Sequence, residues 1–464
     1  MTTVRLEELA PCFQGVTPSI LATCGRDGEP NVTYVSQLFY VDAKHLALSC
    51  QFFNKTRRNL GENPHATAVV HDPRDFRAWR IQLRYLRSET SGALFDTMAA
   101  RIQVIASHTG MAGIFRLLSA DVCEVVEVEP IERLLLPEPL AFAPRTDELP
   151  DGPLTELRGL QCITERIARA PNLERLLEAT LSALDDVFGF THSMLFVPEG
   201  TECRLVAIGT HGYGETGVGG EIAIGEGLVG TVAGERRMMR LAGLSGELRY
   251  GRAIRDQFAR SSGDAKLRPE VPLPGLADAQ AALALPLLAG DELVGVLAVE
   301  SRDPLAFDEW DEAFLQIVAN QIATAIERLQ EDEEPSAPAT PAATAPSTPS
   351  PPPAVSRRRF VYYRNDDCIF VDGDYLIRNV PAKILWKLLN QHRTSGQREF
   401  SNRELRLDPA LGLPSYKDNL ESRLILLRRR LETKCPEVRL VPVRRGRFAL
   451  ELAVDVELEE RATA

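Results

Sequence analysis

Long hydrophobic runs are absent from this sequence: no stretch of its 464 residues approaches the roughly 20 apolar residues that a membrane-spanning helix needs. The first residues, MTTVRLEELAPCF, include acidic side chains and lack the apolar core of a secretory signal. The eight cysteines are scattered and include no CxxC pair, which argues against a disulfide framework and against a metal site built from thiolates alone. We therefore expect a cytoplasmic protein that does not enter the membrane.

The familiar catalytic motifs are also missing. The sequence contains no HExxH, no GxxxxGK[ST] and no recognisable Ser-His-Asp set. His192, His211, Cys162 and Cys203 are not spaced as the ligands of a metal site are. We therefore predict no catalytic residue and no metal site.

The formal net charge of −12 is unevenly distributed. From Arg357 to the end of the chain there are 22 lysines and arginines against 16 aspartates and glutamates, whereas the rest holds 31 against 49. An acidic body with a basic end indicates a polyanionic partner for the C-terminal part only. The length is that of about three domains.

The most regular pattern lies between residues 282 and 329. Two apolar runs, 283–288 and 293–299, flank a Gly-Asp turn and predict two paired strands. Asp308 stands where the N-cap of a following helix belongs. That helix carries an apolar seam suited to a partner helix, formed by Val318, Ile322, Ala325 and Leu329.

Together with GEGLVGTVA at 225–233, FDE at 307–309 and ANQIATAIE at 319–327, this pattern resembles a GAF domain over residues 155–330. GAF domains are small-molecule sensors, and the resemblance implies that the long segment 235–279 folds over a ligand pocket. The residues expected to contact a ligand are His211, Tyr213, Tyr250, Arg252 and Phe258.

A helix is also expected before this domain, because Leu157, Leu160, Ile163 and Ile167 recur at helical spacing. Helices at both ends of a sensor core are a usual route to a parallel homodimer. The alternative is that both helices only cover their own core.

Residues 16–130 read as short strands separated by turns, which indicates a closed barrel rather than a parallel sheet. The expected strands are 20–23, 31–40, 45–50 and 66–71, with a helix at 55–62.

The phrases LAT at 21–23, DGEP at 27–30, NP at 63–64 and ATAVV at 66–70 resemble the split barrels of pyridoxamine-phosphate-oxidase-like flavin proteins, and we assign residues 1–140 to such a domain. The resemblance implies that basic and hydroxyl side chains grip the FMN phosphate. The residues in that region are Ser49, Asn54, Lys55, Thr56 and Arg57. Haem is a less favoured cofactor, and the alternative to cofactor binding is a barrel kept as a dimerisation scaffold.

Residues 331–356 hold little but acidic residues followed by Pro, Ala, Ser and Thr, and this composition predicts a linker. Beyond it we expect short strands within 360–378, a helix from Pro381, and a capping box at Ser401–Glu404 that opens a second helix. A third helix is expected from about Ser415. Its core stripe would be Leu420, Leu424, Leu427 and Leu431.

Strands, three helices and a basic hairpin around 444–447 resemble the winged helix-turn-helix output domain of bacterial response regulators, over residues 357–464. The residues that this resemblance places near DNA are Lys417, Asn419, Ser422, Arg423, Arg429, Arg430 and Arg445. Ile425 and Leu426 do not fit the exposed outer face of such a helix. The alternative is a solvated basic helix in a protein-interaction module.

The sequence thus predicts a multidomain α+β protein: a split β-barrel, a GAF α/β sensor sheet with flanking dimer helices, and a winged helix-turn-helix. The favoured hypothesis is a homodimeric one-component transcriptional regulator that senses a small molecule or a redox state and binds DNA. The alternatives are a flavin-dependent oxidoreductase regulated by its GAF domain, and a protein-binding signalling scaffold.

Overall fold

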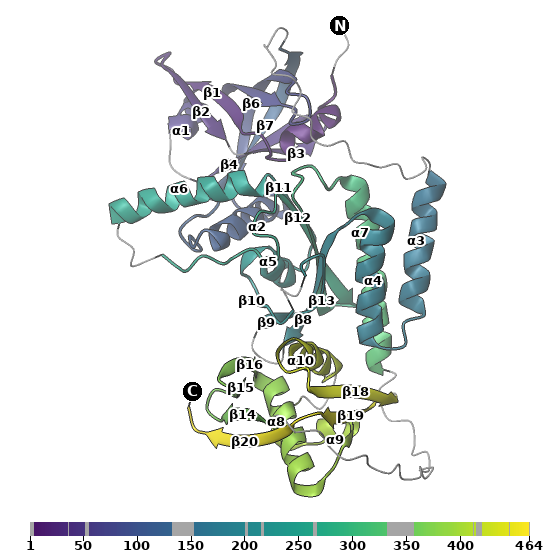
Figure 1. The fold of residues 1–464 in the computed structure, drawn as a ribbon. Helices are drawn as coiled ribbons and strands as arrows, with labels where there is room; N and C mark the ends of the chain where they lie inside the picture. The colour runs from purple at the N-terminus through teal and green to yellow at the C-terminus, as the bar shows by residue number, and fades with distance from the viewer. Residues whose placement is uncertain are drawn as a thin grey trace.

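The computed structural model describes residues 4–35, 37–51, 55–131, 153–199, 203–214, 218–262, 267–331, 357–411, 413, 420–444 and 446–463. They form an N-terminal domain (4–131), a middle domain (153–331) and a C-terminal domain (357–463), arranged one after another in Figure 1. Among these residues no helix is long and apolar enough to cross a membrane. The predicted linker, apart from Glu331, lies outside the described residues.

The N-terminal domain is built on one seven-stranded sheet in the order β2-β1-β5-β6-β7-β4-β3, with every neighbouring pair antiparallel. Its elements are η1 (Leu6–Phe13), β1 (Ser19–Cys24), β2 (Pro30–Val35), β3 (Leu38–Asp42), β4 (His45–Cys50), α1 (Lys55–Glu62), β5 (His65–His71), β6 (Ala78–Glu89), α2 (Ala93–His108) and β7 (Ser119–Pro130).

The prediction of a single strand over 31–40 is wrong, because the chain changes edges of the sheet within it. β2 pairs with β1 at one edge, whereas β3 pairs with β4 at the other. Gln37 lies at this crossing, and its side-chain amide donates a 2.6 Å hydrogen bond to the carbonyl of Phe13. Alternation of side chains continues through the crossing and therefore cannot reveal it.

The middle domain contains a six-stranded antiparallel sheet in the order β10-β9-β8-β13-β12-β11. Its elements are α3 (Pro153–Ala168), α4 (Leu173–Phe188), β8 (His192–Glu199), β9 (Arg204–His211), β10 (Glu221–Ala223), α5 (Gly227–Glu235), β11 (Met239–Ala242), α6 (Leu244–Ser262), β12 (Ala281–Ala289), β13 (Glu292–Ser301) and α7 (Glu309–Glu331).

Helices α4 and α7 cover one face of this sheet, and α3 packs against these two helices on their outer side (Figure 1). The predicted β12–β13 hairpin is confirmed, and so is the N-cap, since the Asp308 carboxylate accepts hydrogen bonds from the backbone N–H groups of Trp310 (2.8 Å) and Asp311 (3.1 Å). All four residues of the predicted α7 seam are buried in this domain's own core. The same cluster includes Ile163 and Ile167 of α3, so the helix that this seam packs against belongs to the same chain.

The other face of the sheet is apolar as well and is covered partly by the N-terminal domain. Ala282, Ala284 and Ala298 belong to one apolar cluster with residues of α5 and of α2, including Ile105. Several polar contacts also fasten α2 to the middle domain, among them an ion pair between Arg101 and Glu247 at 3.3 Å. The Gln103 side chain donates to the carbonyl of Gly225 (3.0 Å), and His108 Nδ1 donates to the carbonyl of Val271 (2.7 Å). The two domains therefore share a continuous core.

The C-terminal domain has a four-stranded sheet, β16-β15-β14-β20, in which β20 runs parallel to β14, and a three-stranded sheet, β17-β19-β18. Its elements are β14 (Arg357–Tyr363), β15 (Cys368–Val371), β16 (Asp374–Arg378), α8 (Asn379–Ser395), β17 (Glu399–Ser401), α9 (Asn402–Arg406), η3 (Pro409–Leu411), α10 (Leu420–Lys434), β18 (Val438–Arg444), β19 (Arg447–Leu452) and β20 (Asp455–Arg461).

The C-terminal domain has an apolar core of its own. The leucine stripe predicted for its third helix is confirmed, since Leu420, Leu424, Leu427 and Leu431 are all buried in that core. The capping box at Ser401 and Glu404 is also present. Of the buried residues in this core, one comes from another domain, Val206 of β9. The domain therefore contains the packing that it needs to fold separately.

The shared core predicts that α2 stabilises two domains at once. Ile105→Ala leaves a cavity in this core and is expected to lower the free energy of unfolding by about 2–5 kcal/mol. Amide hydrogen exchange is expected to accelerate in β5 of the N-terminal domain and in β12 of the middle domain together. Asp96→Ala, an exposed position on the same helix, is the control, at a cost below about 1 kcal/mol. Faster exchange in β5 alone would contradict the shared core.

Candidate functional sites

The N-terminal domain has a pocket between its sheet, α1 and α6 of the middle domain. It contains about 680 Å³ of space, part of it open to solvent. Leu21, Leu48 and Leu60 supply apolar walls, and Tyr250 of α6 closes one side. Tyr250 also packs edge-on against Phe115, with ring centroids 6.5 Å apart. The pocket is therefore completed by a residue of the next domain.

Of the predicted cofactor residues, Ser49, Thr56 and Arg57 line this pocket together. Lys55 does not line it and instead forms an ion pair with Glu29, with Nζ 2.6 Å from the carboxylate. Asn54 lies outside the described residues. Three of the five predicted residues therefore lie together, and the side chain of Lys55 faces elsewhere.

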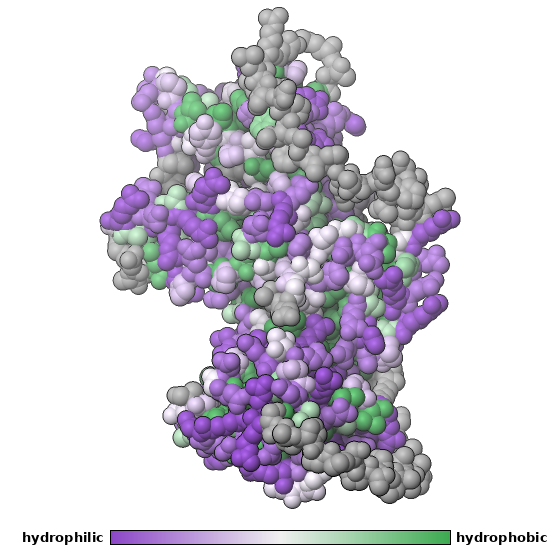
Figure 2. Space-filling model, viewed as in Figure 1, coloured by the Kyte–Doolittle hydropathy of each residue, from purple (hydrophilic) through white to green (hydrophobic). Residues whose placement is uncertain are grey.

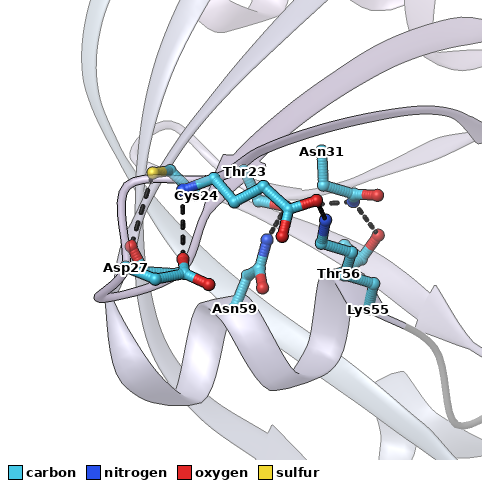
Figure 3. Close-up of polar contacts among 9 residues, drawn as sticks. Thr23, Cys24, Asp27, Asn31, Lys55, Thr56 and Asn59 are labelled. Atoms are coloured by element: carbon cyan, nitrogen blue, oxygen red, sulfur yellow. Dashed lines mark hydrogen bonds and ion pairs between the residues drawn. The ribbon is translucent and has the colours of Figure 1, made fainter.

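A hydrogen-bond network fixes the start of α1 beside β1 and β2 (Figure 3). The Asn31 amide donates to the Thr56 hydroxyl (3.0 Å) and to the Thr23 hydroxyl (3.2 Å). The Asn59 amide donates to the same Thr23 hydroxyl (3.3 Å). Because Thr56 accepts from Asn31, its own proton remains free to be donated to a ligand.

The donors in this pocket fit a phosphate group. The hydroxyls of Ser49 and Thr56 and the guanidinium of Arg57 lie on its lining, and such donors bind an anionic phosphate well. The lining also includes the Asp121 carboxylate, which sequence reasoning missed. That carboxylate already accepts hydrogen bonds from Ser88 (2.5 Å) and Ser119 (2.8 Å). A phosphorylated ring system such as FMN fits these residues and the apolar walls.

The ligand residues predicted for the middle domain are not brought together. His211 Nε2 lies 2.7 Å from the Asp185 carboxylate of α4, and Arg252 pairs with Glu270 at 3.1 Å. Phe258 packs against the core shared with the N-terminal domain, and Tyr250 faces the pocket described above. The physical reason is that α2 of the N-terminal domain packs against α5 and α6, so residues of α6 contact that domain instead of enclosing a ligand within the middle domain.

The fifth predicted residue, Tyr213, binds a buried carboxylate instead. Its hydroxyl donates to Glu300 Oε2 (2.9 Å), which also accepts from the backbone N–H of Leu276 (2.7 Å). Glu300 is 3% exposed, and its burial raises the pKa of the carboxyl above the ordinary value. Burial beside Glu300 likewise raises the pKa of Tyr213 far above its usual range. Glu300 was missed, although an acidic residue in an apolar strand was a usable signal.

Helix α10 lies between its own domain and the middle domain (Figure 1). At 3.6 residues per turn, Ser422, Ile425, Leu426 and Arg429 lie opposite its leucine stripe. Ile425 is fully buried in the apolar cluster of the middle domain. The outer face of this helix is therefore covered.

Several residues that the sequence places near DNA are affected by this packing. Ser422 and Arg423 are only 4% and 6% exposed, so the open helical face expected around them is corrected. Arg429 and Arg430, near the end of the helix, are half-buried. The cause is contact between domains, which the periodicity of one helix does not reveal.

The other three residues predicted to lie near DNA, Lys417, Asn419 and Arg445, lie outside the described residues. The hairpin β18–β19 flanks Arg445, and its Arg444 and Arg447 line a pocket together with Asn172 and Leu329 of the middle domain. The basic hairpin therefore also faces the middle domain.

Comparison with known families supports two of the three resemblances. A sequence profile described as GAF domain matches residues 172–326, and one described as Pyridoxamine 5'-phosphate oxidase matches residues 6–114. The middle domain is a GAF domain. It follows a pyridoxamine-phosphate-oxidase-like split barrel in a mixed α/β multidomain chain. Neither profile reaches the C-terminal domain, and no curated protein matches the chain.

Similar solved structures cover one domain at a time. A GAF domain of a phosphoenolpyruvate-protein phosphotransferase from Coxiella burnetii is 24% identical, covering 39% of this chain and 96% of that chain with a TM-score of 0.32. A free methionine-R-sulfoxide reductase from Neisseria meningitidis is 17% identical, covering 39% and 95%, with a TM-score of 0.31. An FMN-binding protein from Syntrophomonas wolfei subsp. wolfei is 20% identical, covering 28% and 89%, with a TM-score of 0.23.

The buried Glu300 predicts a pH dependence of stability. Because its pKa is raised in the folded protein, the unfolded chain releases this proton first as pH rises. The free energy of unfolding therefore falls as pH rises from the ordinary pKa of 4.5 to the raised pKa of the folded protein. Glu300→Gln keeps an acceptor oxygen for Leu276 and Tyr213 without the charge.

The advantage of Glu300→Gln over wild type in urea unfolding is expected to grow as pH rises from about 4.5 and then to level off. Glu235→Gln, at an exposed position on α5, is the matched control and should follow wild type throughout. If the free energies of unfolding of wild type and Glu300→Gln change in parallel with pH, the pKa of Glu300 is not raised in the folded protein.

Proposed function

We propose that this protein is a one-component transcriptional regulator, with a GAF domain and a split barrel as its sensors and the C-terminal domain as its DNA-binding output. The observation that carries the proposal is the order of elements in the C-terminal domain. A capped short helix, α9, precedes the leucine-cored α10, and the hairpin β18–β19 follows with basic residues at its tip. This order resembles that of a winged helix-turn-helix domain, whose third helix enters the major groove, and it supports the proposal.

The charge distribution agrees with a DNA-binding role for this domain. Helix α10 contains a run of three consecutive arginines, 428–430, and the hairpin that follows adds Arg444 and Arg447. The visible face of this domain is largely hydrophilic (Figure 2). A net basic segment at the end of an otherwise acidic chain favours a nucleic-acid phosphate backbone as its partner.

The sensing side of the proposal rests on the barrel pocket. Ser49, Thr56 and Arg57 would hold the phosphate of FMN, and Leu21 and Leu48 would contact its ring. When bound, a flavin supplies redox chemistry. The small-molecule effector of the GAF domain is a separate part of the proposal.

Winged helix-turn-helix proteins commonly bind two half-sites as dimers, and we propose a homodimer here as well. Trp310 and Ile317 of α7 and Leu157 of α3 are large apolar side chains that this chain leaves exposed, at 74%, 44% and 62%. They lie on the two helices that flank the GAF core, which favours these helices as the contact between protomers.

If FMN binds in this pocket, substitutions of two neighbouring basic residues should affect FMN binding differently. Arg57→Ala is expected to weaken FMN binding by about tenfold or more, because it removes a charged donor from the pocket lining. Lys55→Ala removes a cation of the same helix that pairs with Glu29 outside the pocket, and it should bind FMN as wild type does. Titration of flavin fluorescence measures both. Equal losses in the two variants would contradict this site, and a wild-type protein that binds no FMN would remove flavin from the proposal.

DNA binding is tested on the segment 357–464, which contains its own core. Its affinity for duplex DNA is expected to fall linearly with the logarithm of salt concentration, as phosphate neutralisation requires. Arg430→Ala is expected to weaken binding by about 1–3 kcal/mol. Arg461→Ala is the matched control, because Arg461 lies on β20 in an ion pair with Glu459. If the folded segment fails to bind DNA at low salt, the proposal that this protein is a transcriptional regulator is overturned.

A further inference from the structure

The outer face of α10 is occupied by an apolar contact with the GAF domain. Ile425 is buried among residues of the GAF core, and Val206 of β9 is buried in the core of the C-terminal domain. Each domain thus places one side chain in the other's core. Leu426, 8% exposed, approaches Gly219 so closely that a Cβ there would lie 3.1 Å from its Cδ1. These residues do not fit an exposed helix face, and the contact explains them.

Two ion pairs border the apolar contact and join the same domains. Arg428 of α10 donates to Glu174 of α4 at 2.9 Å, and both side chains are largely buried. Arg378 of β16 donates to Glu221 of β10 at 2.8 Å. Both acids belong to the GAF domain and both arginines to the C-terminal domain. The acidic body and the basic end of the chain therefore meet here with complementary charge.

The covered face is the one that a winged helix needs for DNA. The third helix of such a domain contacts bases with the side opposite its own core. In α10 that side holds Ser422, Ile425 and Leu426, all buried against or beside the GAF domain. A DNA duplex and the GAF surface cannot occupy the same side of one helix.

We propose that the GAF surface formed by the start of α4, β9 and the residues 218–221 is a docking surface for α10, and that it masks the DNA-binding face of the C-terminal domain. This inference rests on the proposed function. The protein binds DNA after the C-terminal domain separates from this surface. A ligand that binds the docked and separated states unequally shifts the balance between them and thereby changes DNA affinity.

Gly219 offers a substitution that obstructs docking from the GAF side alone. A Cβ at this position would lie 2.8 Å from a guanidinium nitrogen of Arg430 as well as close to Leu426. Gly219 has a positive φ of 80°, a conformation that asparagine tolerates better than other residues with a side chain. Gly214→Asn is the matched control, because Gly214 lies in the same β9–β10 connection with a φ of 65° and has nothing within 4 Å of its Cβ position.

A charge exchange tests the same contact independently. Glu174→Arg places like charges together at Arg428, and combining it with Arg428→Glu restores an opposite-charge pair. The double variant therefore tests whether this ion pair holds α10 in place. Because Gly219→Asn leaves the net charge unchanged, a general gain of positive charge cannot explain tighter DNA binding by both Gly219→Asn and Glu174→Arg.

The experiment compares the full chain with these variants, measuring affinity for a DNA duplex and amide hydrogen exchange in residues 420–434. Gly219→Asn and Glu174→Arg are expected to bind DNA about tenfold tighter or more than wild type and to exchange faster in α10. Gly214→Asn should match wild type in both measurements, and the charge-exchanged double variant should return α10 to the exchange rates of wild type.

Three results would overturn the masking. If wild type and all variants bind DNA equally tightly, masking is wrong while DNA binding stands. If the amide hydrogens of α10 exchange at the same rate in wild type and in all variants, the proposed contacts do not hold α10 against the GAF domain. If faster exchange appears but no protein binds DNA even at low salt, the DNA-binding function itself fails and masking fails with it.

Discussion

The six-stranded sheet of the GAF domain is apolar on both faces, and this constraint organises the whole molecule. Alternation along β12 places Leu283 and Leu285 on one face and Ala282 and Ala284 on the other. The leucine face is filled by the domain's own helices. The other face, which also carries larger side chains such as Met194 and Phe196, is covered by α5 of the same domain and by α2 of the barrel domain. Because an apolar sheet face must be covered, the barrel is held against the sensor by the same burial that stabilises the sensor.

Because of this shared core, the pocket of the barrel domain is lined by residues of two domains. Its wall includes Tyr250 of α6, a helix that contacts α2 and belongs to the GAF domain. A ligand in the pocket therefore touches both domains at once. On the far side of the same sheet, β9 meets α10 of the C-terminal domain. The sheet thus contacts both the candidate input and the proposed output, without a long connection between them.

The sequence predicted the features that depend on residues close together in the chain, and it did not predict those that depend on distant residues. The β12–β13 hairpin, the Asp308 cap and the leucine stripe of α10 depend on neighbours within a few turns or strands, and the sequence predicted them. The crossing between β2 and β3 and the role of Tyr250 depend on distant partners, so periodicity could not reveal them. Ile425 and Leu426 are the instructive case: their misfit with an exposed face was visible in the sequence, and only the neighbouring domain explains it.

Masking of α10 would make sensing and DNA binding reciprocal. If DNA and the GAF surface compete for one face of the helix, DNA binding must favour the separated state by the same free energy by which docking opposes it. A ligand held equally well in both states would change nothing, however tightly it bound. An effective ligand must therefore contact groups whose positions differ between the states. The contacts among Glu174, Gly219 and α10 are made only when the domains are docked, so ligand binding that alters them acts directly on the output.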